Sequence, residues 1–137
     1  MSIIVTDMGF RPNTLNLDFK AYSDHADDPC ALDLPSHASL DEILIDFAKT
    51  SAIRIDFPSF ADGRGFTLAR LLRLRGFKGH LRAKGHIISD QYAMARRSGF
   101  DDVEITDEQA QRQPEAEWIA RANWQQHDYQ TRMRKSA

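Results

Sequence analysis

The stretch Ile53-Arg54-Ile55-Asp56-Phe57 alternates apolar and charged residues and is followed at once by Pro58. This period-two alternation is typical of a β-strand that buries one face and not the other, and a proline ends such a strand. The same alternation occurs in residues 31–34, 81–84 and 102–105. We therefore expect four strands, each with one apolar face and one charged face.

Segments with a helical spacing of apolar residues separate these strands. Capping boxes, formed by Ser39 with Glu42 and by Thr106 with Gln109, indicate helix starts. The alternation of strands and helices predicts a parallel sheet with right-handed crossovers. Helices are expected over residues 40–47, from Leu68 to Gly76, from Ile88 to Gly99, after Thr106, and from Pro114 through Trp118 and Ile119 to Ala122.

The charged face of each predicted strand limits where the helices can pack. Burying unpaired charges under a second layer of helices costs several kcal/mol each, so the helices cover one face only. The other face must be wet, internally paired or covered by a partner. Half of a (β/α) barrel has this construction. We predict an α/β protein in which four βα units form a small parallel, half-barrel-like sheet with helices mainly on one face. The alternative is a doubly wound sheet.

The 137 residues are enough for one domain with one core. Residues 1–30 are expected to form an irregular N-terminal segment, with a short strand at Ile3 to Val5. Residues 31–113 carry the βα pattern and form the predicted α/β core. Residues 114–137 are expected to hold a C-terminal helix and a polar tail.

The charge balance and the cysteine content limit the function. Lys and Arg number 18 and Asp and Glu number 20, which gives a net charge of −2 and argues against nucleic-acid or membrane-surface binding. Cys30 is the only cysteine, so the chain cannot form an internal disulfide or an iron–sulfur cluster of its own thiolates. We see no secretory signal and no apolar run that could span a bilayer, so a cytoplasmic location is expected.

The loop that contains Asp62, Gly63, Arg64 and Gly65 is the first candidate binding site. It follows a predicted strand and precedes a predicted helix, which is where parallel α/β sheets bind ligands. A helix N-terminus favours anions, and the Arg64 guanidinium adds a planar charged fork, so a sulfate, sulfite or phosphate group would suit this loop. The alternative is a tight turn in which the glycines adopt positive φ angles and Arg64 pairs with Asp62.

Four further residues complete the candidate substrate-binding set. Arg82 and Lys84 lie on the charged face of a predicted strand and could act with the loop and Asp56 on an anionic compound. Asp90 and Gln91 open the third predicted helix, where capping is the alternative to ligand contact. The histidines show no metal-ligand spacing, and the glycine pattern lacks a residue of the dinucleotide fingerprint. We therefore expect neither a metal nor a cofactor.

The combination of Asp62-Gly63-Arg64-Gly65 with Leu81-Arg82-Ala83 and Asp90-Gln91 resembles the bacterial domain of unknown function 934 family. The resemblance extends from Leu32 to Ile105. It is carried by residues 57–66, 69–73, 79–85, 90–91 and 98–101.

This resemblance implies a role in assimilatory sulfite reduction, and the family carries an oxidoreductase label for which the chain shows no flavin, nicotinamide or cluster motif. The implied function is an accessory protein that acts with sulfite reductase or its electron donor. One alternative is a small enzyme or sensor that binds an oxyanion at the loop of residues 62–65. Another is a structural homodimer that closes two sheets face to face.

Overall fold

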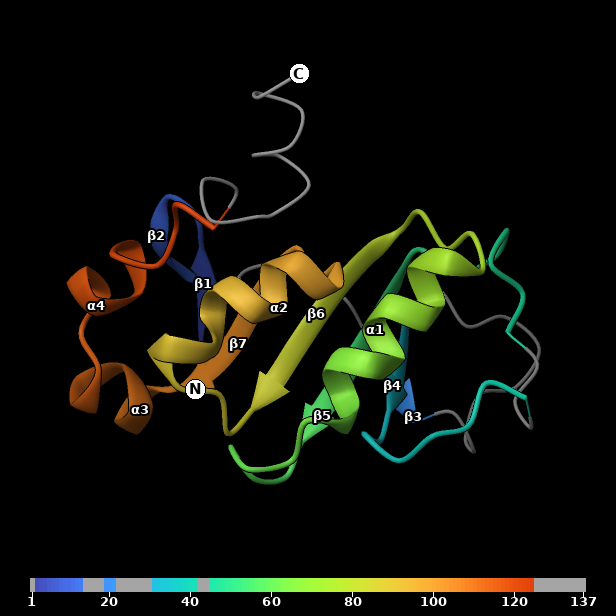
Figure 1. Ribbon diagram of the computed structural model, residues 1–137, viewed down its shortest axis with the longest axis horizontal. Helices are drawn as coiled ribbons and strands as arrows, with labels where there is room; N and C mark the ends of the chain where they lie inside the picture. The colour runs from blue at the N-terminus through green and yellow to red at the C-terminus, as the bar shows by residue number, and fades with distance from the viewer. Residues whose placement is uncertain (1, 14–18, 22–30, 42–44, 125–137) are drawn as a thin grey trace, which may run out of the picture.

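A computed structural model describes residues 2–13, 19–21, 31–41 and 45–124. Within these residues seven strands form one sheet in the order β2-β1-β7-β6-β5-β4-β3 (Figure 1). Strands β3 to β7 are parallel to one another, whereas β1 is antiparallel to both β7 and β2. The strands are β1 (Ser2–Thr6), β2 (Gly9–Pro12), β3 (Lys20–Ala21), β4 (Ala31–Leu34), β5 (Ala52–Phe57), β6 (His80–Gly85) and β7 (Asp102–Thr106).

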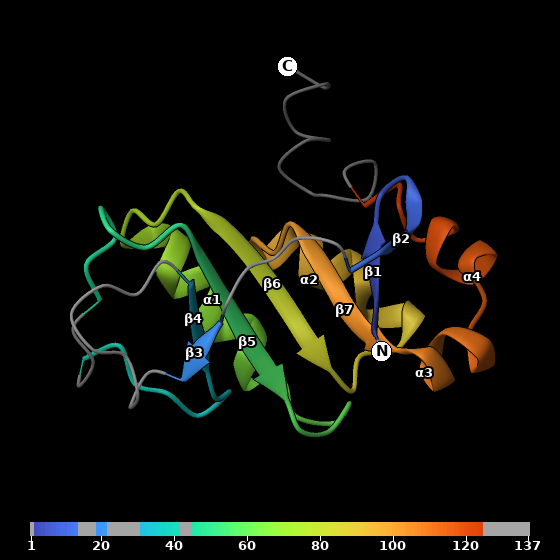
Figure 2. The ribbon, with the colours of Figure 1, turned by 180° about the vertical axis from the view of Figure 1, so that it is seen from behind.

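The helices that connect the central strands lie on one face of the sheet. Helix α1 (Arg64–Leu74) connects β5 to β6, and α2 (Tyr92–Ser98), preceded by the 3₁₀ helix η2 (Ser89–Gln91), connects β6 to β7. The opposite face carries neither α1 nor α2 (Figure 2). Two successive right-handed crossovers in the same direction place both helices on the same side, so the sheet is not doubly wound. The predicted fold class is confirmed. We call α1, η2, α2 and the loop of residues 58–63 the helix layer.

The strand register confirms the prediction that each strand has a charged face. One row across the sheet aligns Asp33, Arg54, Arg82 and Asp102, and the next row aligns Asp56, Lys84 and Glu104. Residues paired in register point to the same side of a sheet, so these side chains share one face, the charged face. Leu34, Ile55, Ala83 and Val103 occupy the row between these two and point toward the helix layer.

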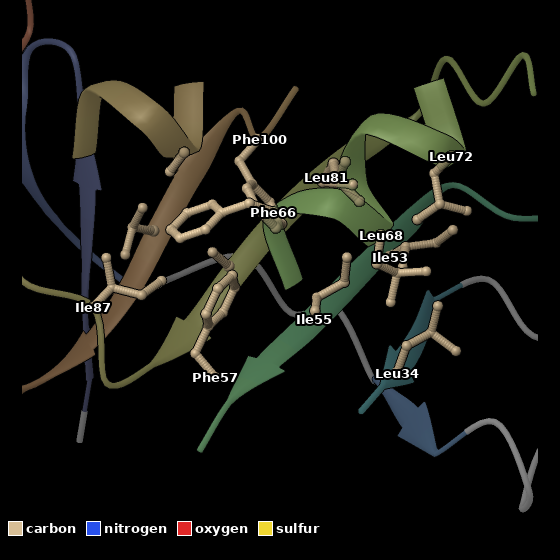
Figure 3. Close-up of a cluster of buried hydrophobic side chains, with 14 of the residues drawn as sticks. Leu34, Ile53, Ile55, Phe57, Phe66, Leu68, Leu72, Leu81, Ile87 and Phe100 are labelled. Carbon is tan, nitrogen blue, oxygen red and sulfur yellow. The ribbon is translucent and has the colours of Figure 1, made fainter. Parts of the chain in front are cut away.

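Aliphatic and aromatic side chains fill the space between the sheet and the helix layer (Figure 3). The ring of Phe57 lies 4.9 Å from that of Phe66 and 5.8 Å from that of Phe100, measured between centroids. A Cβ atom on Gly65 would lie 2.8 Å from two carbons of the Phe57 ring, so only glycine fits there. The expectation that Gly63 and Gly65 adopt positive φ angles is wrong: Gly63 has φ −89°, and Gly65 is required by close packing.

An N-terminal hairpin extends the sheet beyond β7. The strand predicted at Ile3 to Val5 is present as β1, and β2 pairs with it after a turn at residues 7–8, with φ 110° at Gly9, the first residue of β2. The described part of residues 1–30 thus contributes three strands, where the sequence indicated one strand in an irregular segment. Residues 14–18 and 22–30 lie outside the described residues.

The connection between β4 and β5 differs from its predicted helix. Residues 40–41 and 47–49 form turns, while residues 42–44, including Glu42 of the capping box, lie outside the described residues. Leu40 is buried, and the Phe47 ring lies 5.4 Å from the Phe77 ring, so this connection is anchored by single apolar side chains. A helix over all of residues 40–47 is therefore not formed.

The last helices follow the predicted order with one shift. Thr106 Oγ1 accepts a hydrogen bond of 3.1 Å from the Gln109 backbone N–H and caps α3 (Asp107–Arg112). Pro114 precedes α4 (Glu115–Ile119) as its N-cap, where the sequence predicted it as the first helical residue. Trp118 is fully buried. None of the helices in the described residues is long and apolar enough to cross a membrane.

Candidate functional site

Arg54 links three strands on the charged face. Its Nε and Nη2 donate to the two carboxylate oxygens of Asp33 at 2.6 and 2.8 Å, and its Nη1 donates to Glu104 Oε1 at 3.1 Å. The Phe19 ring centroid lies 4.2 Å from Arg54 Cζ, so the guanidinium also contacts an aromatic face. Desolvation opposes the charge of Arg54, but the hydrogen bonds to Asp33 and the two nearby carboxylates raise its pKa.

Arg82 lies deeper on the same face and is 1% exposed. Its Nε and Nη2 donate to Asp102 at 2.9 and 3.1 Å, and His80 Nε2 lies 2.9 Å from the same carboxylate. Burial alone would raise the pKa of Asp102, but the hydrogen bonds and charges of His80 and Arg82 lower it. The sequence left three possibilities for the charged face, which could be wet, internally paired or covered by a partner. The contacts of Arg54 and Arg82 show that the charges around these two arginines are paired internally.

The β5–α1 loop holds its charges in a closed pair. Arg64 donates from Nε and Nη2 to the Asp62 carboxylate at 2.9 and 2.8 Å, and the Arg64 backbone N–H donates to Asp62 Oδ1 at 3.1 Å. Ser36 Oγ donates to the other carboxylate oxygen at 2.8 Å. The hydrogen bonds from Arg64 hold the pKa of Asp62 well below its usual range. Asp62 thus places a negative charge at the start of α1, as in the predicted turn.

Gln91 connects this loop to the next helix. Its Nε2 donates to the Phe60 carbonyl at 2.7 Å, and its Oε1 accepts from the Ile88 backbone N–H at 3.1 Å. The side chain of Asp90 instead accepts from Arg121 Nη2 at 2.7 Å, where both side chains are exposed. Gln91 therefore fixes the position of the loop, whereas Asp90 contacts the C-terminal part of the chain.

Two hollows lie at the carboxyl edge of the parallel strands. The first, which we call the Arg64 hollow, has a volume of about 250 Å³ and is lined by Ser36, His37, Ala38, Arg64, Thr67, Leu68 and Leu71. The second, the Lys84 hollow, has a volume of about 270 Å³ and is lined by Asp33, Leu34, Pro35, Asp56 and Lys84. The loop that follows β4 contributes to both hollows.

All candidate residues predicted from the sequence except Asp90, which pairs with Arg121, therefore belong to one of two groups. Asp62, Gly63, Arg64 and Gly65 belong to the loop that Gln91 holds in place. Arg82 and Lys84 belong to the charged face, with Arg82 in the paired layer and Lys84 at the strand end. Ser36 and His37 are not among the residues predicted from the sequence, although polar residues directly after a strand are a recognised signal for the carboxyl edge.

A third hollow lies at the opposite edge of the sheet, near the start of β6. Its volume is about 740 Å³, and its Arg73 side chain donates to the backbone carbonyls of Gly99, Phe77 and Gly79. Arg73 thus satisfies backbone carbonyls that follow the ends of α1 and α2, so its role is structural. Within the described ranges, no group of three or more His, Cys, Asp or Glu residues could hold a metal ion.

The fold and its edge hollows define an α/β protein with one layer of helices over a mostly parallel sheet. The chain belongs to DUF934, a family of bacterial proteins of unknown function, which matches it over residues 31–137. The match begins at the first residue of β4, so the hairpin of β1 and β2 precedes it. No curated protein and no solved structure matches the chain.

Proposed function

We propose that this chain is an accessory protein of assimilatory sulfite reduction, which binds sulfite reductase or its electron donor. The link to sulfite reduction comes from the family resemblance carried by residues 62–65, 81–83 and 90–91. The observation that supports a binding role is the group of exposed apolar side chains on the helix layer.

Four of the six large apolar side chains that are exposed in the described residues belong to the helix layer: Phe60, Leu71, Leu74 and Met94, with exposed fractions of 60, 39, 76 and 53%. Leu71 and Leu74 are three residues apart on α1 and so share one face. The Phe60 carbonyl accepts a hydrogen bond from Gln91. Gln91 lies three residues before Met94 in the chain. Large apolar side chains that are exposed at a surface are typical of protein interfaces. We call these four residues the apolar patch.

The internal pairing of the charged face supports the same proposal. Arg54 and Arg82 already bind carboxylates of their own sheet, so these two arginines act in the structure of the face. The alternative of a homodimer closed through this face receives less support, because its paired layer needs no charges from a second copy.

A matched pair of variants tests the apolar patch. Leu74 and Met8 are both 76% exposed, but Met8 lies in the turn between β1 and β2. We expect tagged wild type and Met8→Glu to retain sulfite reductase or its electron donor from sulfate-grown cells, and Leu74→Glu to lose it, as measured by mass spectrometry. Equal retention by both variants, or no reductase component with wild type, would contradict the proposal.

A second candidate function is oxyanion binding by an enzyme or sensor at the Arg64 hollow. The observation that favours it is that His37, Arg64 and Thr67 line one hollow beside the start of α1. Asp62 competes with any anion there, because it already occupies Nε and Nη2 of Arg64. Calorimetric titration with sulfate, sulfite and phosphate tests this function: wild type should bind, Arg64→Ala should lose binding, and Arg64→Lys should rescue it only partly. No binding by wild type would exclude it.

A further inference from the structure

The Lys84 hollow lies where three parallel strands end on the charged face. Asp33 lies near the end of β4, and Asp56 and Lys84 are register partners near the ends of β5 and β6. The carboxyl edge of a parallel sheet is the usual place for a small ligand. Its volume of about 270 Å³ is below the range of about 300–1,000 Å³ for drug-sized ligands, so the occupant must be small.

Asp56 and Lys84 differ from the other charges around them. In the part of the chain that the structure describes, neither side chain has a hydrogen bond or an ion pair, although the two face each other on adjacent strands. Glu104, the neighbour of Lys84 on β7, is within ion-pair distance of Arg54 and Arg82, at 3.1 and 3.7 Å. One carboxylate and one ammonium group are thus left over at the edge of an otherwise paired layer.

These two charges define the ligand that would complement them. We propose that the Lys84 hollow binds a small zwitterion of the α-amino acid class, with its carboxylate on Lys84 and its ammonium group on Asp56. Adjacent strands are about 4.8 Å apart, and an α-amino acid carries both charges on one carbon atom, so one molecule can reach both side chains. The flexible stem of Lys84 allows its ammonium group to adjust to the ligand.

The layer beneath the hollow gives the site its selectivity. Asp33, whose two oxygens are held by Arg54 at 2.6 and 2.8 Å, forms a wall that is already neutralised. A simple anion would satisfy Lys84 but would leave its charge next to the Asp56 carboxylate. A simple cation would satisfy Asp56 but would leave its charge next to the Lys84 ammonium group. A molecule that carries both charges avoids both repulsions.

Titration of the purified chain with single α-amino acids tests this proposal, with acetate and methylammonium as ligands that carry one charge each. We expect one or more amino acids to bind, by calorimetry or by shifts in the amide NMR spectrum, and the single-charge ligands to bind much more weakly. Lys84→Gln and Asp56→Asn should each weaken binding roughly ten- to a hundredfold. Lys78→Gln, at the opposite edge of the sheet, should leave the affinity unchanged.

The charge-swapped double variant Asp56→Lys with Lys84→Asp provides a second test, because it presents the same two charges with their positions exchanged. It should recover affinity relative to either single charge reversal. Binding of acetate as strong as that of the best amino acid would overturn the proposal, as would no binding of any amino acid at millimolar concentration. Unchanged binding by Lys84→Gln would also overturn it. The result does not depend on the apolar patch, since Leu74→Glu should bind amino acids as wild type does.

Discussion

Gly63 and Gly65 stand two residues apart in one loop but face different constraints. A Cβ atom on Gly65 would collide with the Phe57 ring, whereas the atom nearest to a Cβ on Gly63 is 4.0 Å away. We expect Gly65→Ala to lower the free energy of unfolding by about 1–3 kcal/mol through overpacking. Gly63→Ala, the control, should change it by less than about 1 kcal/mol, because its φ of −89° suits alanine. Urea denaturation measures both, and equal effects would contradict the packing argument.

Asp102 allows a prediction about pH. Its pKa is lowered in the folded protein because His80 and Arg82 bind the carboxylate and together outweigh its burial. A carboxyl group with a lowered pKa stabilises the fold above its unfolded pKa of about 3.9, and this stabilisation is lost as the pH falls through the folded pKa. Melting curves from pH 6 to pH 2 should therefore show a steeper loss of stability below about pH 4 for wild type than for Asp102→Asn.

The same variant should be less stable than wild type at pH 7, by about 1–3 kcal/mol, because it weakens the hydrogen bonds of the buried Arg82 and leaves Glu104, at 3.7 Å, as its charged partner. Asp41→Asn is the control, since Asp41 is 85% exposed and its pair with Arg75 is a surface pair. If Asp102→Asn and wild type lose stability in parallel on acidification, the carboxylate of Asp102 does not carry the acid sensitivity.

The sequence could predict which residues carry the charges but not how they pair. Arg54, Arg82 and Glu104 were assigned to one face from their alternation with apolar residues, and the register confirms this. The contact between Arg54 and Glu104 joins residues of β5 and β7 across β6, so it depends on strand order and side-chain reach. Neither quantity can be read from a local pattern, and the same holds for the tie between Gln91 and Phe60.

At the scale of whole elements, strands were predicted better than their connections. A period-two pattern that is followed by Pro35 or Pro58 is a local signal, and β4 and β5 end directly before these prolines. The capping box of Ser39 also predicted a helix, but the described residues there form turns, because a local capping signal does not ensure that a helix follows. The hairpin of β1 and β2 was predicted only in part, because β2 has one buried residue, Gly9, and no clear alternation.

The hairpin is fastened to the rest of the fold by Asp7. Its carboxylate accepts hydrogen bonds from Tyr92 Oη at 2.5 Å, from Arg96 at 3.1 and 3.2 Å, and from Trp124 Nε1 at 3.2 Å. Asp7→Ala leaves these donors without their acceptor, so we expect a loss of about 1–3 kcal/mol in the free energy of unfolding. Asp41→Ala, which removes a carboxylate from an exposed pair, should cost less than about 1 kcal/mol.

Thermal and urea unfolding of the two variants compare these effects directly. Tyr92 gives a second measurement, because burial first and the Asp7 carboxylate second raise the pKa of its hydroxyl group far above the usual value. Spectroscopic titration of tyrosine should therefore show this group ionising at a lower pH in Asp7→Ala than in wild type. A tyrosine titration that Asp7→Ala leaves unchanged would argue against the contact.

The molecule as a whole presents two unlike surfaces. Among the described residues of strands β4 to β7, the charged face is paired within the chain except at Asp56 and Lys84, whereas the helix layer leaves Phe60, Leu74 and Met94 exposed. We therefore assign the proposed protein partner to the helix layer and the proposed small charged ligand to the strand ends. Because the two proposed sites lie on separate surfaces, a variant in the apolar patch should leave ligand binding at the Lys84 hollow intact, and a variant in the hollow should leave partner binding intact.

Deletion of the gene tests the role in sulfur assimilation. If the chain assists sulfite reductase, a deletion strain should grow slowly on sulfate or sulfite as the sole sulfur source. It should grow normally on sulfide or cysteine, because these compounds enter after the reduction step. A plasmid copy of the wild-type gene, or of Met8→Glu, should restore growth on sulfite, whereas Leu74→Glu should not, since it places a charge in the apolar patch. Normal growth of the deletion strain on sulfite would remove the main support for the proposed function, and full rescue by Leu74→Glu would remove the patch as its binding surface.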